Sequence, residues 1–551
     1  ILCVAGAGLV LWQQSQPPGV TPQSRNDLPV EPLATLQPTL PARPTRTPQP
    51  TTQSQEPLPT RAPAAEGVAD ETLRTLRGEI VPVNDPVLLA ERLKGKKDIA
   101  PTIPAPAQPL RIGDHQKFWV TNSDNDEKRQ ANATLRYITD KLYFWIEDGV
   151  SYDEREMRRL ADTFTQKIYP TDREFFGSEW TPGVDDAPRL HVLYANQIGS
   201  TVAGYFSSAD EIPPAAFEFS NAREMFVLSA ENVSLGEEYI YGVMAHEFQH
   251  MIHYHTDRNE ESWMNEGFSV LAELLNQYDI GGFDYLFMNN PDLALTYWPG
   301  PGQSGPNYGA SFLYLNYFLN RFGEKATQAL VANPDNGMDS VDRVLSDLGE
   351  KDPQTGQTLT ADDVYADWAV ANYLDDSKLD GGRYFYQNYP SAPKASATDE
   401  YDTCPVDRQA STVNQYGTDY IRITCQGKHT LTFQGATQVP LLPEDAYSGQ
   451  YAFWSNKGDE SDMTLTREFD FTTVSGPITF SYRTWYDIEK GYDYVYLLAS
   501  EDGENWDMLK PPSGTDENPN GSNFGWGYNG DTGPVWIRED VDLSKFAGKK
   551  V

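Results

Sequence analysis

AHEFQHMIHYHTDRNEESWMNEGFS (Ala245–Ser269) holds four of the seven histidines in this 551-residue chain. His246 and His250 stand in an H-E-x-x-H pattern, with Glu247 directly after the first histidine. In a helix, residues four positions apart lie on one face, about one turn from each other. Two imidazoles so placed can bind one Zn²⁺, and the adjacent glutamate can serve as a general base toward water. The pattern therefore predicts a catalytic zinc site.

A catalytic zinc ion needs a third protein ligand beside an open coordination position. The arrangement H-E-x-x-H-x-x-G-x-x-H is not met, because His253 stands at its Gly position and Thr256 at its last ligand position. The alternative is a glutamate on the next helix, and Glu266 lies 16 positions after His250 (266 − 250 = 16). That length suffices to end one helix, turn and begin an antiparallel one, with Gly267 letting the backbones approach closely. We therefore predict Glu266 as the third ligand.

The segments AHEFQHMIH and WMNEG together resemble the gluzincin-type zinc metallopeptidases, particularly the hyicolysin-like bacterial enzymes, over residues 113–390. The resemblance implies a zincin-like catalytic domain in which the two histidines and the glutamate hold the metal. The spacing to the glutamate is a few residues shorter than in thermolysin-like members, and Val270 stands where those members carry an acidic residue that orients a ligand. Asn265 or Ser269 is expected to take over that task.

Two further site elements follow from the same resemblance. Peptide hydrolysis needs a donor for the developing oxyanion, and Tyr308, at the start of a predicted helix, is our candidate. A packing role for this tyrosine is the alternative. Zincin-like folds carry one antiparallel edge strand along the cleft, and the order of the strands assigns it to Val202–Ser208. An extended substrate would pair with that edge, backbone to backbone.

The other polar residues of the opening segment are expected to play lesser parts. His253 lies one turn beyond His250 on the same face, too far along the helix for one tetrahedral metal to bind all three histidines. It is predicted to be a buried neighbour, and His255 a surface residue. Glu260 and Glu273 are predicted to be solvated or capping residues, and Glu261 is a weaker alternative ligand.

Outside this segment, strand patterns precede helix patterns. Short apolar or alternating runs predict strands at residues 117–122, 141–148, 189–195, 202–208 and 224–229. Periodicity predicts helices at 151–169, from 234 through the histidines, and at 261–277, 308–322 and 361–374. Ser151 with Glu154, and Ser234 with Glu237, match capping signals for the first two helices. Strands followed by helices indicate an α+β domain.

Composition divides the chain into six predicted parts. They are a truncated signal peptide or membrane anchor (1–12), a disordered Pro/Thr/Gln-rich spacer (13–70), a weakly structured segment with a propeptide role left open (71–112), the zincin-like metallopeptidase domain (113–390), a β-rich connecting module (391–442) and a MAM-like β-sandwich, truncated at its C-terminal end (443–551).

Beyond residue 390 the pattern changes to short alternating strands between Gly, Asp and Asn turns, which is typical of a β-sandwich. Residues 443–551 resemble the MAM-like domain of the immune inhibitor A peptidases, through segments such as TWYDIEKGYDYVYLLASEDGENWDML. Cys404 and Cys425 are expected to form a disulfide if the chain is exported, with two free thiols as the alternative. Five acidic residues of this region are candidates for a Ca²⁺ site, with solvated turns as the alternative: Asp459, Asp462, Asp487, Glu489 and Asp493.

The formal net charge of −37 argues against a nucleic-acid partner, which needs a basic surface. We predict a secreted or cell-surface zinc endopeptidase that hydrolyses protein or peptide substrates through a metal-activated water, with a membrane or cell-wall tether. The alternative is an adhesion or carbohydrate-binding protein with an inactive zincin domain. Glu247 argues against that alternative, because an inactive site has no use for a general base. The predicted architecture is an α+β zincin-like catalytic domain, an all-β sandwich region after it and a disordered N-terminal spacer.

Overall fold

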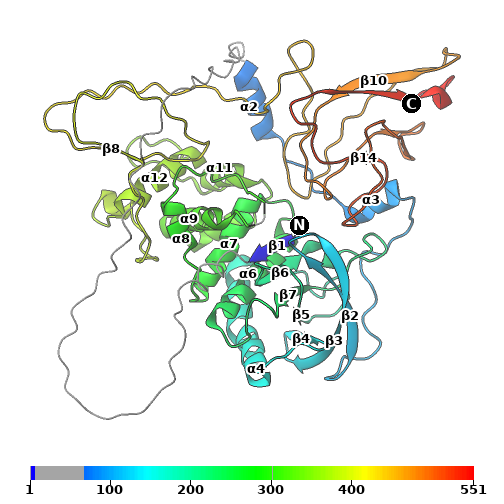
Figure 1. The fold of residues 1–551 in the computed structure, drawn as a ribbon, viewed down its shortest axis with the longest axis horizontal. Coiled ribbons are helices and arrows are strands. Elements are labelled where there is room, and N and C mark those ends of the chain that lie inside the picture. The colour runs from blue at the N-terminus through cyan, green and yellow to red at the C-terminus, as the bar shows by residue number, and fades with distance from the viewer. Residues whose placement is uncertain (1, 6–67, 301) are drawn as a thin grey trace, which may run out of the picture.

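The computed structural model describes residues 2–5, 68–300 and 302–551 (Figure 1). The predicted spacer at 13–70 lies outside the described residues except for its last three positions, and so does most of the predicted leader at 1–12. Of the described helices, none has the length and apolar character that crossing a membrane requires.

A seven-stranded mixed sheet forms the first layer of the fold, in the order β1-β6-β7-β5-β4-β3-β2. Strands β4, β5 and β7 run parallel at its centre, whereas β6, β1, β3 and β2 pair antiparallel on either side. The strands are β1 (Leu2–Ala5), β2 (His115–Asn122), β3 (Glu127–Ile138), β4 (Leu142–Glu147), β5 (Leu190–Ala195), β6 (Gly204–Ser207) and β7 (Met225–Ser229).

Burial explains which strands were predictable. Every residue of β5 and of β7 is buried, as expected for central parallel strands covered on both faces. Strand β3 was not predicted, since its segment EKRQANATLRYI is largely polar and only four of its twelve positions are buried. The predicted antiparallel edge strand at Val202–Ser208 is β6. In the structure its outer edge pairs with β1, with Leu2 opposite Ser207 and Ala5 opposite Gly204.

Two α-helices precede β2, two lie between β4 and β5, and the others follow the sheet in the chain. The helices are α2 (Val68–Gly78), α3 (Pro86–Leu93), α4 (Glu154–Thr163), a π-helical turn (Phe164–Ile168), α5 (Tyr169–Phe176), α6 (Glu238–Thr256), α7 (Ser262–Leu275), α8 (Phe283–Met288), α9 (Gly305–Phe322), α10 (Glu324–Val331), α11 (Gly337–Leu348) and α12 (Ala361–Leu374). Helices packed beside a mixed sheet, such as α6 in Figure 1, confirm the predicted α+β class.

Both predicted capping signals are wrong. Helix α4 begins after Asp153, whose carboxylate accepts hydrogen bonds from the backbone N–H groups of Arg155 and Glu156 at 2.8 and 3.2 Å, so Ser151 is not its cap. Helix α6 begins only at Glu238, because Ser234 and the three residues after it form a turn closed by the Glu237 N–H. In both cases the helix begins three or four residues after the predicted cap residue.

Helix α6 is the centre of the main core. All residues from Ile240 to Tyr254 are buried, so the helix has no solvent face over four turns. It packs against β6 on one side and against α7 on the other, and α7 packs in turn against α9. The main core joins this helix layer to one face of the sheet, through side chains such as Phe226 and Phe268. His246 and His250 therefore lie in fully packed surroundings, each 1% exposed.

After α12, the described chain contains strands and short 3₁₀ turns but no α-helix, which confirms the predicted C-terminal strand region. The strands pair two by two: β8 (Asp399–Tyr401) with β9 (Ile421–Ile423), β10 (Thr479–Thr484) with β15 (Ile537–Asp542), β11 (Val495–Tyr496) with β14 (Gly527–Tyr528), and β12 (Leu498–Ala499) with β13 (Asp507–Met508). Leu509, Val541 and Phe546 belong to a small separate core. Cys404 and Cys425 form the predicted disulfide.

Candidate metal centre

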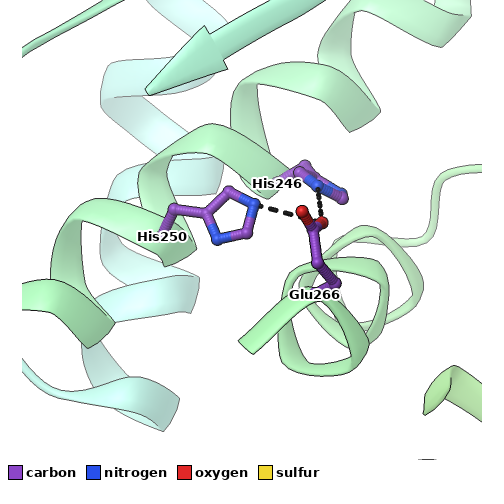
Figure 2. Close-up of side chains that lie close together, drawn as sticks. All are labelled: His246, His250 and Glu266. Carbon is purple, nitrogen blue, oxygen red and sulfur yellow. Dashed lines mark hydrogen bonds and ion pairs between the residues drawn. The ribbon is translucent and has the colours of Figure 1, made fainter. Parts of the chain in front are cut away.

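Three side chains from two helices meet beneath the sheet edge. His246 and His250 project from α6, and Glu266 projects toward them from the first turns of α7 (Figure 2). Glu266 Oε2 lies 3.2 Å from His246 Nε2 and 3.4 Å from His250 Nε2. The nearest ligand atoms of the three residues all lie within 4.8 Å of one another. Within the described part of the chain, this is the one group of three or more His, Cys, Asp or Glu side chains close enough to share an ion.

Local structure accounts for this meeting. The two histidines are one turn apart on α6, and their ring centroids are 4.8 Å apart. Gly267 also matters, although not between α6 and α7 as predicted. A Cβ at Gly267 would lie 2.8 Å from Leu315 Cδ1 and 2.9 Å from Ser311 Cβ, both on α9. Because Gly267 has no Cβ, α9 can pack closely against α7 at the position next to Glu266.

Hydrogen bonds hold both imidazoles in one orientation. His246 Nδ1 lies 2.8 Å from Glu273 Oε1, and His250 Nδ1 lies 2.8 Å from Asn265 Oδ1 and 3.0 Å from Ser269 Oγ. A carboxylate and an amide oxygen can only accept, so they favour the proton on each Nδ1 and a lone pair on each Nε2. Two imidazole lone pairs and one carboxylate oxygen, all aimed at one point, form a donor set that suits Zn²⁺.

Asn265 and Ser269 thus lie where the sequence analysis expected a ligand to be oriented, but Glu273 was misjudged. The prediction that Glu273 is solvated or capping is wrong, because it is only 4% exposed and contacts His246. Glu273 follows Glu266 by seven positions, or about two helical turns, so both face α6. That spacing is the signal that would have identified it.

The electrostatics of the three residues are those of a cation site. Burial acts to raise the pKa of Glu266, but His250 and His246 outweigh it and hold this pKa at about 2. Burial acts to lower the pKa of His246, but hydrogen bonds with Glu266 and Glu273 raise it to about 9. Without a metal the carboxylates therefore favour a positive charge on His246, and a bound cation would take the place of that proton.

Glu247 lies beside this group but points to the sheet. It is fully buried, and its Oε2 accepts a hydrogen bond of 2.7 Å from the backbone N–H of Phe206 in β6. Its Oε1 has no hydrogen-bond partner among the described residues. Burial raises the pKa of Glu247 to about 7, against the opposing influence of the two histidines. A carboxylate with one oxygen anchored and the other available, and with a pKa near neutrality, has the properties of a general base.

Tyr308, near the start of α9, lies close to the same group. Its ring centroid is 6.1 Å from that of His246, and the ring is 3% exposed. It also stacks on Phe283 at 5.0 Å and meets Trp298 edge-on at 4.9 Å. The position is compatible with both predicted roles, an oxyanion donor and a packing tyrosine.

The remaining predictions for the opening segment have mixed outcomes. His253 is fully buried against Phe268, and burial lowers its pKa to about 3, so it is a neutral neighbour as predicted. His255 is exposed, as predicted. The prediction of a solvated Glu260 is wrong, because this residue is 1% exposed. Glu261 occupies the N-cap position of α7 and accepts a hydrogen bond from the indole of Trp263, away from the metal group.

The five acidic residues predicted for calcium in the C-terminal region do not gather in the same way. No three of them, within the described chain, bring carboxylate oxygens within 4.8 Å of one another. The calcium site at Asp459, Asp462, Asp487, Glu489 and Asp493 therefore remains without structural support, and solvated or locally bonded turns describe these residues better.

Comparison with known proteins adds the following. Residues 413–551 match the family model "Immune inhibitor A-like, MAM domain". The chain is 22% identical over 278 residues to the neutral metalloprotease ShpI of Staphylococcus hyicus, which covers 45% of this chain and 62% of that protein. It is 36% identical over 112 residues to immune inhibitor A of Bacillus thuringiensis subsp. alesti, which covers 19% of this chain and 14% of that protein.

The chain therefore spans less than two thirds of each of these relatives. The MAM match begins within the predicted connecting module at 391–442 and includes all of 443–551. Both predicted resemblances, to bacterial zinc metallopeptidases and to the MAM-like domain of the immune inhibitor A peptidases, are thereby confirmed.

Proposed function

We propose that this protein is an exported, zinc-dependent endopeptidase. The observation that supports it most is the convergence of His246, His250 and Glu266 on one point, with their ligand atoms within 4.8 Å of one another and Glu247 beside them. The name of the first relative supports the coarser statement, that the chain is similar to a metalloprotease. Zinc fits the donor set of two imidazoles and a carboxylate better than a hard cation, which prefers oxygen ligands alone.

In this proposal each residue of the site has one task. His246, His250 and Glu266 hold the zinc ion, and Glu273, Asn265 and Ser269 keep the imidazoles turned toward it. When bound, zinc lowers the pKa of water and polarises a carbonyl oxygen. Glu247 accepts the proton of the attacking water and delivers it to the leaving amine. Tyr308 donates a hydrogen bond to the oxyanion.

The same proposal assigns the substrate to the edge of β6. This strand adjoins Glu247 through the Phe206 N–H, and its outer edge accepts another strand, as its pairing with Leu2–Ala5 illustrates. An extended polypeptide bound there would run beside the general base. Protein and peptide chains are therefore the proposed substrate class, with backbone pairing rather than one side chain fixing the position of the scissile bond.

Two measurements on the full chain test this function. Metal analysis should find about one zinc per chain, lost in His246→Ala and in His250→Ala but retained in His255→Ala, since His255 is exposed and lies outside the group. Digestion of unfolded proteins should fall on the order of 10²–10⁴-fold in Glu247→Gln, which keeps the size of the side chain but cannot accept a proton.

The outcome also separates the proposal from its alternative. A wild-type protein that holds zinc yet digests none of a broad set of unfolded substrates would favour the adhesion or carbohydrate-binding function. A Glu247→Gln variant that digests as fast as the wild type would remove this residue from the mechanism while leaving the zinc site in place.

A further inference from the structure

The loop between α6 and α7 contains three buried polar side chains with incomplete hydrogen bonding. Asp257, Asn259 and Glu260 are 6%, 0% and 1% exposed. Within the part of the chain that the structure describes, one oxygen of each has no hydrogen-bond partner: Asp257 Oδ2, Asn259 Oδ1 and Glu260 Oε2. Burying such oxygens without a partner is costly, and an ionised carboxylate is the most costly case. Three of them in four consecutive residues require a common explanation.

The backbone brings these side chains together. Residues 258 and 259 are the central pair of a tight turn, so Asp257 and Glu260 stand at its two ends. The Cα atoms at the ends of such a turn lie within about 7 Å of each other. Asp257 is also the strongest charge acting on Glu260. The two carboxylates therefore lie close enough to influence each other electrostatically.

Other hydrogen bonds fix the orientation of this group. Glu260 Oε1 accepts from the backbone N–H groups of Glu261 and Gly337, at 2.6 and 2.7 Å. Asn259 Nδ2 donates to the carbonyl of Val81 at 3.1 Å, and the Asn336 side chain donates to the carbonyl of Asn259. These bonds occupy Glu260 Oε1 and the amide and carbonyl groups of Asn259, and the three oxygens named above remain without a partner among the described residues.

The carboxylates of this loop also lack a positively charged partner among the described residues. Neither Asp257 nor Glu260 forms an ion pair with any described Lys, Arg or His; the one ion pair of the loop joins Lys457 to Glu261 at 3.8 Å. Burial, and then Asp257, raise the pKa of Glu260 well above its usual value. Burial raises the pKa of Asp257 to about 6, and Asp335 acts in the same direction. The group needs a positive partner that the described residues do not supply.

We propose that the α6–α7 turn binds one Ca²⁺ through Asp257 Oδ2, Asn259 Oδ1 and Glu260 Oε2. Carboxylate and amide oxygens are the ligands that Ca²⁺ takes in proteins, and backbone carbonyls or water complete its six to eight positions. The site uses none of the five acidic residues predicted for calcium in the C-terminal region, although Asp459 lies nearby and accepts a hydrogen bond from Ser262. It fixes the turn that joins the helix bearing His246 and His250 to the helix bearing Glu266, so it positions these ligands without touching them.

A shared proton is the competing explanation. A protonated Glu260 could donate to Asp257 and satisfy two of the three free oxygens without any metal. The two explanations differ in their response to Ca²⁺. A calcium site makes the stability of the native protein depend on free Ca²⁺, whereas a shared proton leaves it unchanged.

The test uses the full chain, stripped with a chelator and then titrated with Ca²⁺. Native mass spectrometry counts bound calcium ions, and thermal unfolding is followed with and without Ca²⁺. Glu260→Gln and Asp257→Asn keep the side-chain sizes but remove one charge each. Glu174→Gln, an exposed change elsewhere on the surface, is the matched control.

We expect the wild type and Glu174→Gln to bind one more calcium than either loop variant and to unfold several degrees higher with Ca²⁺. Equal calcium counts in the wild type and in both loop variants would overturn the proposal, as would a wild type whose unfolding ignores Ca²⁺. If Glu260→Gln does not fold, the calcium count and unfolding of Asp257→Asn alone are compared with those of the wild type. If neither variant folds, the calcium response of the wild type, measured against equal Mg²⁺, decides: a shift with Ca²⁺ alone supports the site.

Discussion

In the metal centre, the burial and the contacts of each residue differ from what its amino-acid type alone would predict. Glu266 and Glu273 lie on one face of α7, both nearly buried, yet they differ in what they contact. Glu266 reaches the Nε2 side of both imidazoles, whereas Glu273 reaches the Nδ1 side of His246. In the proposed zinc site, Glu266 would therefore be a ligand and Glu273 would orient His246.

This difference leads to a prediction about the third ligand. Glu266→Ala should lower zinc affinity strongly, because a site with two protein ligands loses the charge that balances the metal. Glu261→Ala should leave zinc affinity nearly unchanged, because Glu261 contacts Trp263 rather than the histidines. Zinc titration against a competing chelator measures both. Strong zinc loss in Glu261→Ala with little loss in Glu266→Ala would reverse the assignment.

At the scale of elements, the site depends on how closely α7 and α9 pack. Gly267 follows Glu266 directly, and a Cβ there would also come within 3.0 Å of the Ser311 backbone. Backbone cannot move aside as a flexible side chain does. The orientation of Glu266 is therefore coupled to the spacing between two helices, only one of which carries it.

Gly267→Ala should consequently destabilise the protein, although alanine is the better helix former. Overpacking of this kind costs about 1–3 kcal/mol in the free energy of unfolding, which exceeds the helix-propensity gain of about 1 kcal/mol. Gly78→Ala is the control, because this glycine ends α2 with nothing within 4 Å of an added Cβ. Denaturant unfolding of both variants checks the expectation, and a Gly267→Ala variant as stable as the wild type would contradict it.

The start of β7 gives a second prediction at this scale. Glu224 is 2% exposed and accepts a hydrogen bond of 2.7 Å from the backbone N–H of Val184. Burial raises its pKa to about 8, with Asp185 acting in the same direction. The folded protein therefore binds a proton at Glu224 more tightly than the unfolded chain, whose glutamate pKa is near 4.5. Stability should fall as pH rises from about 4.5 to 8.

Glu224→Gln should remove this part of the pH dependence, since glutamine keeps the acceptor for Val184 but does not titrate. Each group contributes at most about 1.4 kcal/mol per pH unit, and other buried acids such as Asp210 titrate nearby. The quantity to compare is thus the difference in unfolding free energy between variant and wild type at several pH values. A difference that stays constant across this range would contradict the assignment, and Glu174→Gln, an exposed change, is the matched control.

At the scale of the whole molecule, local sequence patterns predicted the features that one helix or strand determines by itself. They did not predict the features that depend on contact between two distant elements. Helix α12 has the predicted bounds, 361–374, because its own sequence determines them. Strand β3 was missed because its polar sequence forms a strand only through its two neighbours. Likewise, spacing in the chain predicted the three proposed metal ligands, whereas the burial of Glu260 depends on contact with the first residue of α11, 77 positions away. Contacts between segments far apart in the chain produce no periodic pattern in the sequence, so sequence periodicity cannot predict them.

The last prediction concerns the molecule as a unit. A zinc ion held by His246, His250 and Glu266 would join α6 to α7 at the centre of the main core, since α6 is buried on all sides. A ligand that binds only the folded state raises its stability by mass action, by about 4 kcal/mol at a thousand times its Kd. A chelator should therefore lower the midpoint of thermal unfolding, and Zn²⁺ added back at fixed Ca²⁺ should restore it. Glu247→Gln should respond like the wild type, because it leaves the three ligands intact. His246→Ala with Glu266→Ala should not respond, and a zinc-dependent shift of wild-type size in that double variant would show that the stabilising ion binds elsewhere.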